Sequence, residues 1–313
     1  MREDSGIAEE LIREIEEMRV RGAYRITCVA LEALALRAKE VAEKGGAFFD
    51  AMAATAERLK AAQPSMASVA NACAYVLKPL THPEAADLTP QEPYRLVTTR
   101  SREFLTGFKR AQQGVVEVGA RVVRDGDVVF VHSYSGTLLG ILHRAREEGK
   151  RFTVIATESR PYCEGREMVA QLLKQDIPCT LIIDMAAGTY LRRATKALVG
   201  GDAILANGSI VNKMGTQLVA LACHAYGIPF YAAASILKFS LQSLQGDKVK
   251  LLERPDDAGI APSALADMEG LQVENRIFDV TPARYIEALI TDRGLLSPAA
   301  VAGFRDDPLL CPP

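Results

Sequence analysis

The sequence is poor in the residues that build zinc sites, disulfide frameworks and membrane anchors. It has 4 His, and its 6 Cys are scattered without a CxxC pair, which disfavours a zinc site and is typical of free thiols in a reducing compartment. No uninterrupted apolar run is long enough to span a bilayer, and the charged start MREDSGIAEEL lacks the apolar core of a signal peptide. We therefore predict a cytoplasmic protein with no metal site and no membrane contact.

An excess of charge of one sign is also missing. The formal net charge is −2 over 313 residues, so the chain as a whole has no general attraction for nucleic acid or anionic lipid. Internal repeats and low-complexity tracts are absent as well. Any anion must therefore be bound locally, by a few residues that the fold brings together.

The first third of the chain has the apolar spacing of helices. Ile7, Leu11, Ile12 and Ile15 recur at three-to-four spacing among Glu and Arg, which predicts a first helix. Further helices are predicted after residue 23, over 47–61, from Pro64 to residue 77, and over 93–121. We interpret residues 1–120 as a helical domain whose last helix bridges into a second domain.

The pattern changes from residue 127 onward, where short apolar runs alternate with helical segments. This alternation predicts a parallel, doubly wound, Rossmann-like sheet over 121–313, with ligands outside the carboxyl ends of its strands. The fold class is therefore α/β, and 242–270 is predicted to be a loop or a small excursion. The predicted strands are 128–131, 152–156, 179–183, 203–206, 229–233 and 276–280. The predicted helices are 138–148, 164–175, 190–198, one starting after Gly215 and one starting at Pro282.

Residues 199–216, VGGDAILANGSIVNKMGT, place an acid, an amide and an ammonium near the start of a helix. Asp202 opens an apolar run, and Asn212 and Lys213 follow a turn just before the helix. Backbone N–H groups at a helix N-terminus can hold a phosphate while an acid acts beside it. An acid ahead of a strand is also common as a solvated strand end, so spacing alone leaves both readings open.

This stretch resembles the signature of a known family. That family contains methylthioribose-1-phosphate isomerase, archaeal ribose-1,5-bisphosphate isomerase and the alpha, beta and delta subunits of eukaryotic initiation factor 2B. Its pattern reads Gly-Ala-Asp, a short strand, Asn-Gly, and then Asn-Lys-x-Gly-Thr. Here Gly201 stands where the family has alanine, and the rest matches. Further matches run from about residue 19 to 295.

The resemblance assigns roles that the residues alone leave open. It implies that Arg21, Gly22 and Ala23, otherwise a helix cap, lie at a sugar-phosphate site, and that Arg160, otherwise a surface ion pair, contacts the ligand. Lys238 follows a strand as in the ribose-bisphosphate and alpha-subunit branches, where a lysine can neutralise a second phosphate. Ser135 lies in a Ser-Gly-Thr turn suited to a phosphate or to a plain helix cap.

Two positions depart from the family pattern. Ser133 stands where the isomerases have a cysteine as the second catalytic group beside the acid, here Asp202. A serine hydroxyl is a far weaker acid than a thiol, whose pKa is about 8.5. Gln63 replaces an arginine at the start of a helix, in the sequence Gln63-Pro64-Ser65 with Asn71 downstream.

The resemblance implies two main functions, and a third, weaker possibility is an isomerase that acts on a different sugar phosphate, with Gln63 and Ser133 retuning the site. The first is an aldose–ketose isomerase that acts on a phosphorylated pentose, most like ribose-1,5-bisphosphate isomerase, with no cofactor. The second is a non-catalytic regulatory subunit, like the initiation factor 2B alpha subunit, that binds a sugar phosphate or nucleotide and an initiation-factor partner. Ser133 favours the second, while Asp202, Asn212 and Lys213 fit either. Both imply a homo-oligomer, at least a dimer.

Overall fold

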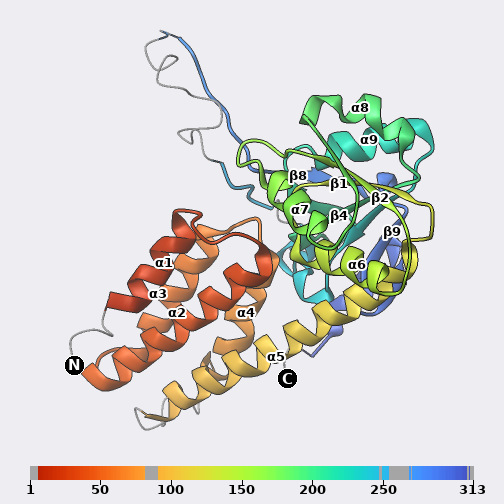
Figure 1. Ribbon diagram of the computed structural model, residues 1–313. Coiled ribbons are helices and arrows are strands. Elements are labelled where there is room, and N and C mark those ends of the chain that lie inside the picture. Colours follow the sequence, from red (N-terminus) through yellow and green to blue (C-terminus); the bar gives the residue numbers. More distant parts are fainter. Residues whose placement is uncertain are drawn as a thin grey trace.

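The structure is a computed structural model that describes residues 6–81, 91–246, 249–253, 268, 270–308 and 310. Figure 1 shows a group of N-terminal helices beside a second body built around a sheet. The helices of the first group are α1 (Ile7–Glu16), α2 (Ala23–Lys44), α3 (Phe48–Ala62), α4 (Ala67–Leu77) and α5 (Gln91–Val122). The predicted helical N-terminal part is confirmed, although α4 begins at Ala67 rather than at Pro64.

Helix α5 belongs to both bodies. It packs against α2 and α4 at one end and against α6 (Gly136–Glu147) and strand β9 at the other, as its course across Figure 1 shows. A Cβ at Gly119 would lie 2.4 Å from Cδ1 of Ile141, so the absence of a side chain there allows α5 and α6 to pack closely. Because one helix spans the junction, the domain boundary at residue 120 remains a prediction.

A seven-stranded sheet forms the centre of the second body, with the strand order β10-β9-β7-β4-β1-β2-β3. All neighbouring strands are parallel except β9 and β10. The strands are β1 (Val128–His132), β2 (Thr153–Thr157), β3 (Cys179–Ile182), β4 (Lys196–Gly200), β7 (Phe230–Ala233), β9 (Ala288–Thr291) and β10 (Gly294–Leu296). The chain builds outward from β1 to β3 and then returns to β4 on the other side of β1, so the strand order reverses between β1 and β4. Ligands of such folds bind at this reversal.

The sheet is buried on both faces, as a doubly wound fold requires. Val129 and Val131 point into a cluster with α5, α6 and α7 (Glu164–Leu173), whereas Phe130 points into a second cluster that includes residues of α9 (Thr216–Tyr226). Figure 1 shows α6 and α7 on one side of the strands and α8 (Ala187–Tyr190) with α9 on another. The predicted α/β fold with a mainly parallel sheet is confirmed.

Three sequence predictions for single elements are wrong. Residues 190–198 end in strand β4 rather than forming a helix, because this segment pairs with both β1 and β7. Residues 203–206 contribute only β5 (Ala203–Ile204), which lies in a separate three-stranded antiparallel sheet with β6 (Ile210–Lys213) and β8 (Phe278–Thr281). The predicted helix from Pro282 does not form. The residues after Pro282 form a short turn and then strand β9, which pairs with β7.

The segment 242–270 was predicted to be irregular. Its first described part is a single 3-10 turn, Gln242–Gln245. Residues 247–248, 254–267 and 269 of this segment lie outside the described residues.

Candidate functional site

A cavity of about 540 Å³ opens where the carboxyl ends of β1 and β4 face the N-terminus of α2. This is the point where the strand order reverses, and the volume is in the range of about 300–1,000 Å³ that small-molecule sites occupy. The predicted site residues that line it are Arg21, Gly22, Ala23, Ser133, Ser135, Asp202, Asn212, Lys213 and Lys238. The fold thus gathers every predicted site residue except Arg160, although their binding and catalytic roles remain predictions.

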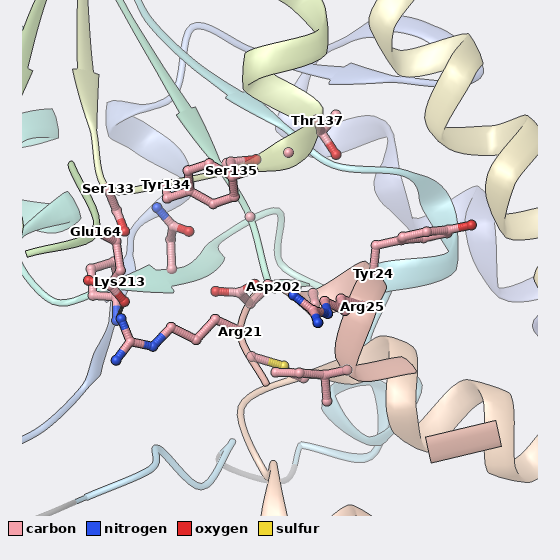
Figure 2. A pocket seen from close by; sticks show the side chains of 18 of the residues that line it. Arg21, Tyr24, Arg25, Ser133, Tyr134, Ser135, Thr137, Glu164, Asp202 and Lys213 are labelled. Atoms are coloured by element: carbon pink, nitrogen blue, oxygen red, sulfur yellow. Dashed lines mark ion pairs between the residues drawn. The ribbon is translucent and has the colours of Figure 1, made fainter. Parts of the chain in front are cut away.

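Asp202 lies in the middle of this cavity. Figure 2 shows its carboxylate between Ser133, Tyr134 and Ser135 on one side and the arginines of the α2 end on the other. The backbone N–H of Asp202 donates to the carbonyl of Val211 at 2.8 Å, which fixes the residue at the junction of β4 with the small sheet. Burial raises the pKa of Asp202, and the nearby ammonium groups of Lys238 and Lys213 only partly oppose this. Asp202 is therefore suited to hold and release a proton.

Lys238 is buried beside Asp202. Its Nζ donates to the carbonyl of Gly201 at 2.6 Å, and burial lowers its pKa while the charge of Asp202 opposes that shift. The turn that carries Lys238 is held by helix α4, because the side-chain amide of Asn71 donates to the carbonyls of Leu237 and Phe239, each at 2.8 Å. Asn71 is therefore a positioning residue for this side of the cavity.

Lys213 forms a buried ion pair that the sequence did not predict. Its Nζ lies 2.7 Å from Oε1 of Glu164, the first residue of α7, and both side chains are more than nine-tenths buried. The same ammonium lies 5.1 Å from the ring centre of Tyr162 and 5.4 Å from that of Phe278. Glu164 comes four residues after Arg160 in the Glu-Ser-Arg-Pro segment. That proximity to a motif was the only sequence signal for it.

Ser133 occupies the first position after β1, with a left-handed backbone conformation at φ 67°. This conformation is uncommon for a residue other than glycine. The backbone N–H of Ser133 donates to Oγ of Ser159 at 2.7 Å, and Oγ of Ser159 lies 3.0 Å from Oγ1 of Thr157. Hydroxyl groups at the end of β2 therefore hold the turn that carries Ser133.

His132 precedes Ser133 and is a structural residue. Its Nε2 lies 2.8 Å from the carbonyl oxygen of Met214, and because a carbonyl only accepts, Nε2 carries the proton. Its Nδ1 lies 2.7 Å from Oγ1 of Thr157, and burial lowers the pKa of the ring. A neutral imidazole therefore joins the end of β1 to β2 and to the residue after β6.

Two helix N-termini face the cavity, and each carries positive partial charge. Helix α6 starts after Ser135, whose Oγ accepts from the N–H of Leu138 at 3.3 Å. Helix α2 starts after Gly22, which has φ 82°, and no side chain caps it. Neither first turn contains an acidic residue, and Arg21 and Arg25 flank the start of α2 on the cavity wall. This arrangement is typical of anion sites. Arg25 was not predicted, although it lies one helical turn after Arg21.

The comparison with family models identifies the relationship that these features suggest. Residues 19–298 match the model of the initiation factor 2 subunit family. The chain belongs to this family.

Members of the family include both enzymes and initiation factors. The chain is 36% identical over 297 residues to the ribose 1,5-bisphosphate isomerase of Haloterrigena turkmenica, covering 92% of this chain and 89% of the relative. The crystal structure of the translation initiation factor eIF-2B of Pyrococcus horikoshii OT3 superposes with a TM-score of 0.80 at 34% identity, covering 93% of this chain and 97% of that one. The 5-methylthioribose 1-phosphate isomerase of the same organism gives a TM-score of 0.73 at 26% identity, covering 95% and 86%.

Arg160, predicted from the family pattern to contact the ligand, does not line the cavity. It lines a separate hollow together with Asp184 and Asp279, and its backbone N–H donates to Oδ2 of Asp184 at 2.7 Å. The nearby Cys163 does not line the main cavity either, and its Sγ lies 3.9 Å from Nη1 of Arg160. Within the segment after β2, Arg160 therefore lies at this second hollow, whereas Glu164 lines the main cavity.

Gln63, which replaces the family arginine, has a structural role. It is buried, and its Nε2 donates to the carbonyl of Ile15 and to Sδ of Met18, each at 3.1 Å. It therefore stabilises the end of α1 and the connection from α1 to α2. The Oγ of Ser65 accepts from the N–H of Leu252 at 2.9 Å, so this residue before α4 also holds a distant segment of the chain.

Over the part of the chain that the structure describes, no helix is both long and apolar enough to cross a bilayer. The same residues contain no group of three or more His, Cys, Asp or Glu side chains that could hold a metal ion.

Proposed function

We propose that this chain is an aldose–ketose isomerase that converts ribose 1,5-bisphosphate into ribulose 1,5-bisphosphate. The observation that carries the proposal is the cavity itself, in which Asp202 lies between two helix N-termini. Each terminus can bind one phosphate, and Arg21 and Arg25 flank one of them. A pentose with a phosphate at each end matches an acid between two anion sites. Relatives that bear the name ribose 1,5-bisphosphate isomerase support the same substrate.

The proposed roles follow from the positions of the residues. Asp202 is the acid and base, because burial raises its pKa above the ordinary value and so favours a carboxyl group that can carry a proton. Arg21, Ser135, Asn212 and Lys238 hold phosphates and hydroxyls, and Lys213 orders the site. An aldose–ketose isomerisation moves hydrogen within one molecule, so it consumes no external reductant. We also infer that the protein acts in the cytoplasm as a homo-oligomer of at least two copies.

Proton NMR of the purified protein with ribose 1,5-bisphosphate tests the proposal, with Asp202→Asn measured alongside. We expect the ketose to appear with the wild-type protein and the rate to fall by about 100-fold or more in Asp202→Asn, since a positioned acid or base contributes about 10²–10⁴-fold. Absence of the ketose with the wild-type protein would refute the isomerase assignment.

A second function is favoured by one residue. Ser133 stands where the isomerases of the family have a cysteine, and the alpha subunit of initiation factor 2B lacks that cysteine too. A regulatory subunit of this kind would bind the sugar phosphate and turn nothing over. Thermal stabilisation by ribose 1,5-bisphosphate without any ketose would select this function, and capture of an initiation-factor subunit would support it.

A further inference from the structure

A second carboxylate, that of Glu164, lines the cavity, and its ion pair with Lys213 uses only one of its two oxygens. The side chain is 9% exposed, and Oε1 lies 2.7 Å from Nζ of Lys213. Its other oxygen, Oε2, is buried, and within the described ranges no hydrogen-bond donor reaches it. A buried carboxylate oxygen without a donor is costly, so its retention on a cavity wall points to a ligand group that meets it.

The strand order of the sheet places Glu164 and Asp202 on either side of the turn after β1, which carries Ser133. The strand order β4-β1-β2 means that Asp202 follows one neighbour of β1 and Glu164 follows the other, with Ser133 after β1 itself. Figure 2 shows Glu164 with Ser133 and Lys213 on one side of the cavity and Asp202 at its centre. A substrate that fills the cavity therefore meets both carboxyl groups.

The two carboxyl groups also interact electrostatically. The charge of Glu164 adds to the effect of burial in raising the pKa of Asp202. Two acids that share a site tend to divide into one protonated and one ionised group, which assigns the acid and the base. Glu164 has the Lys213 ammonium beside it, at 2.7 Å from Oε1.

We propose that Glu164 is the general base of the isomerisation, in a chain that has Ser133 in place of the catalytic thiol of the family's isomerases. This inference rests on the proposed function. The Glu164 side chain, which lines the cavity, takes the proton of C2, and Lys213 holds Oε1. Glu158, directly after β2, does not fit the role because it does not line the cavity.

The reaction balances with these two groups alone. Protonated Asp202 gives its proton to the ring oxygen as the bond from C1 to that oxygen breaks. Glu164 removes the proton from C2, and the electron pair of that C–H bond forms the C1=C2 double bond of an enol phosphate. Glu164 then returns its proton to C1, while the Asp202 carboxylate takes the proton of the C2 hydroxyl and C2 becomes a ketone. Both side chains regain their starting forms, and the proton of C2 has moved to C1.

The test is Glu164→Gln, assayed with ribose 1,5-bisphosphate beside the wild-type protein. Glutamine keeps the size of the side chain and an oxygen that accepts from Lys213, but it cannot take a proton. We expect kcat to fall by about 100-fold or more with KM within about threefold, and Glu164→Asp to recover part of the loss. In deuterated water, the wild-type ketose should retain some protium from C2 at C1, because one base carries it.

Glu40→Gln is the matched control. Glu40 is also a buried glutamate and forms an ion pair with Arg37 at 2.9 Å. Among the described residues no donor reaches its Oε1, but it lies in α2 and does not line the cavity. We expect kcat to be unchanged in this variant, and thermal unfolding of both variants separates folding from catalysis. If Glu164→Gln fails to fold, a folded Glu164→Asp with reduced kcat and unchanged KM carries the same conclusion.

The outcomes separate the two proposals. A wild-type protein that makes no ketose overturns the proposed function and the role of Glu164 with it. A wild-type protein that makes ketose while Glu164→Gln keeps kcat within tenfold overturns only the role of Glu164. A rise in KM with kcat unchanged also overturns it, because that result describes a residue that only binds substrate.

Discussion

Substitution of Gly200 by alanine should disturb the cavity through one contact. A Cβ at this position would lie 2.8 Å from Oγ and 2.9 Å from Cβ of Ser135, closer than real side chains approach. Ser135 must therefore move, and it caps α6 by accepting from Leu138 N–H. Loss of a cap costs about 0.5–2 kcal/mol, and overpacking costs about 1–3 kcal/mol. We expect Gly200→Ala to lower the free energy of unfolding by about 1–3 kcal/mol.

The neighbouring glycine supplies the control. A Cβ at Gly201 would lie 3.3 Å from Cβ of Ala234, so a shift of a few tenths of an ångström accommodates it. The family pattern has alanine at this position. We expect Gly201→Ala to change the free energy of unfolding by less than about 1 kcal/mol, which is the usual range for tolerated small changes.

Urea unfolding followed by circular dichroism measures both variants, and calorimetry measures binding of the sugar bisphosphate to Gly200→Ala. The displaced Ser135 should weaken binding by about tenfold, which corresponds to about 1.4 kcal/mol. Equal losses of stability in the two variants would contradict the reasoning. So would a crystal structure of Gly200→Ala in which Ser135 keeps its position.

Two further predictions concern buried carboxylates outside the cavity. Burial raises the pKa of Asp279 from 3.8 to about 6, although the N–H groups of Gln217 and Gly215 oppose the shift. The folded state therefore holds this proton more tightly than the unfolded state. The free energy of unfolding should fall by about 3 kcal/mol as the pH rises from about 4 to about 6. Asp279→Asn should flatten this pH dependence in urea titrations. Lys196→Met should cost about 3–5 kcal/mol in the same assay, because it leaves the Asp127 carboxylate, 2.6 Å from Nζ of Lys196, buried without its cation. The double variant Asp127→Asn with Lys196→Met should recover part of the loss, and a single variant as stable as the wild type would show that the pair contributes nothing.

Local pattern determined the helical N-terminal part and the compact motif that contributes Asp202, Asn212 and Lys213 to the cavity. The repeat of Ile12 and Ile15 at helical spacing specifies a buried stripe whatever the partner is, because the period of a helix is a property of the local backbone. The stretch 199–216 carries its acid, amide and ammonium within a few residues of one another. Their proximity in space is therefore largely set by their proximity in the chain.

Elements that depend on distant partners were not determined locally. The run Lys196–Gly200 consists of residues that suit a helix or a buried strand, and only pairing with β1 and β7 selects the strand. Pro282 is a common first residue of helices, yet the chain after it pairs with β7 to extend the sheet. In both cases the long-range hydrogen bonds of the sheet override a weak local preference.

The chemistry of the site was decided in the same two ways. Asp202, Asn212 and Lys213 were candidates from the sequence because a compact motif carries them, and the family resemblance favoured them as site residues. Only the tertiary structure set Glu164 against Lys213 and placed Arg160 at a different hollow, because the fold of the segment after β2 decides which hollow each residue lines. The charge and shape of the site depend on residues from distant segments, and these meet only in the folded chain.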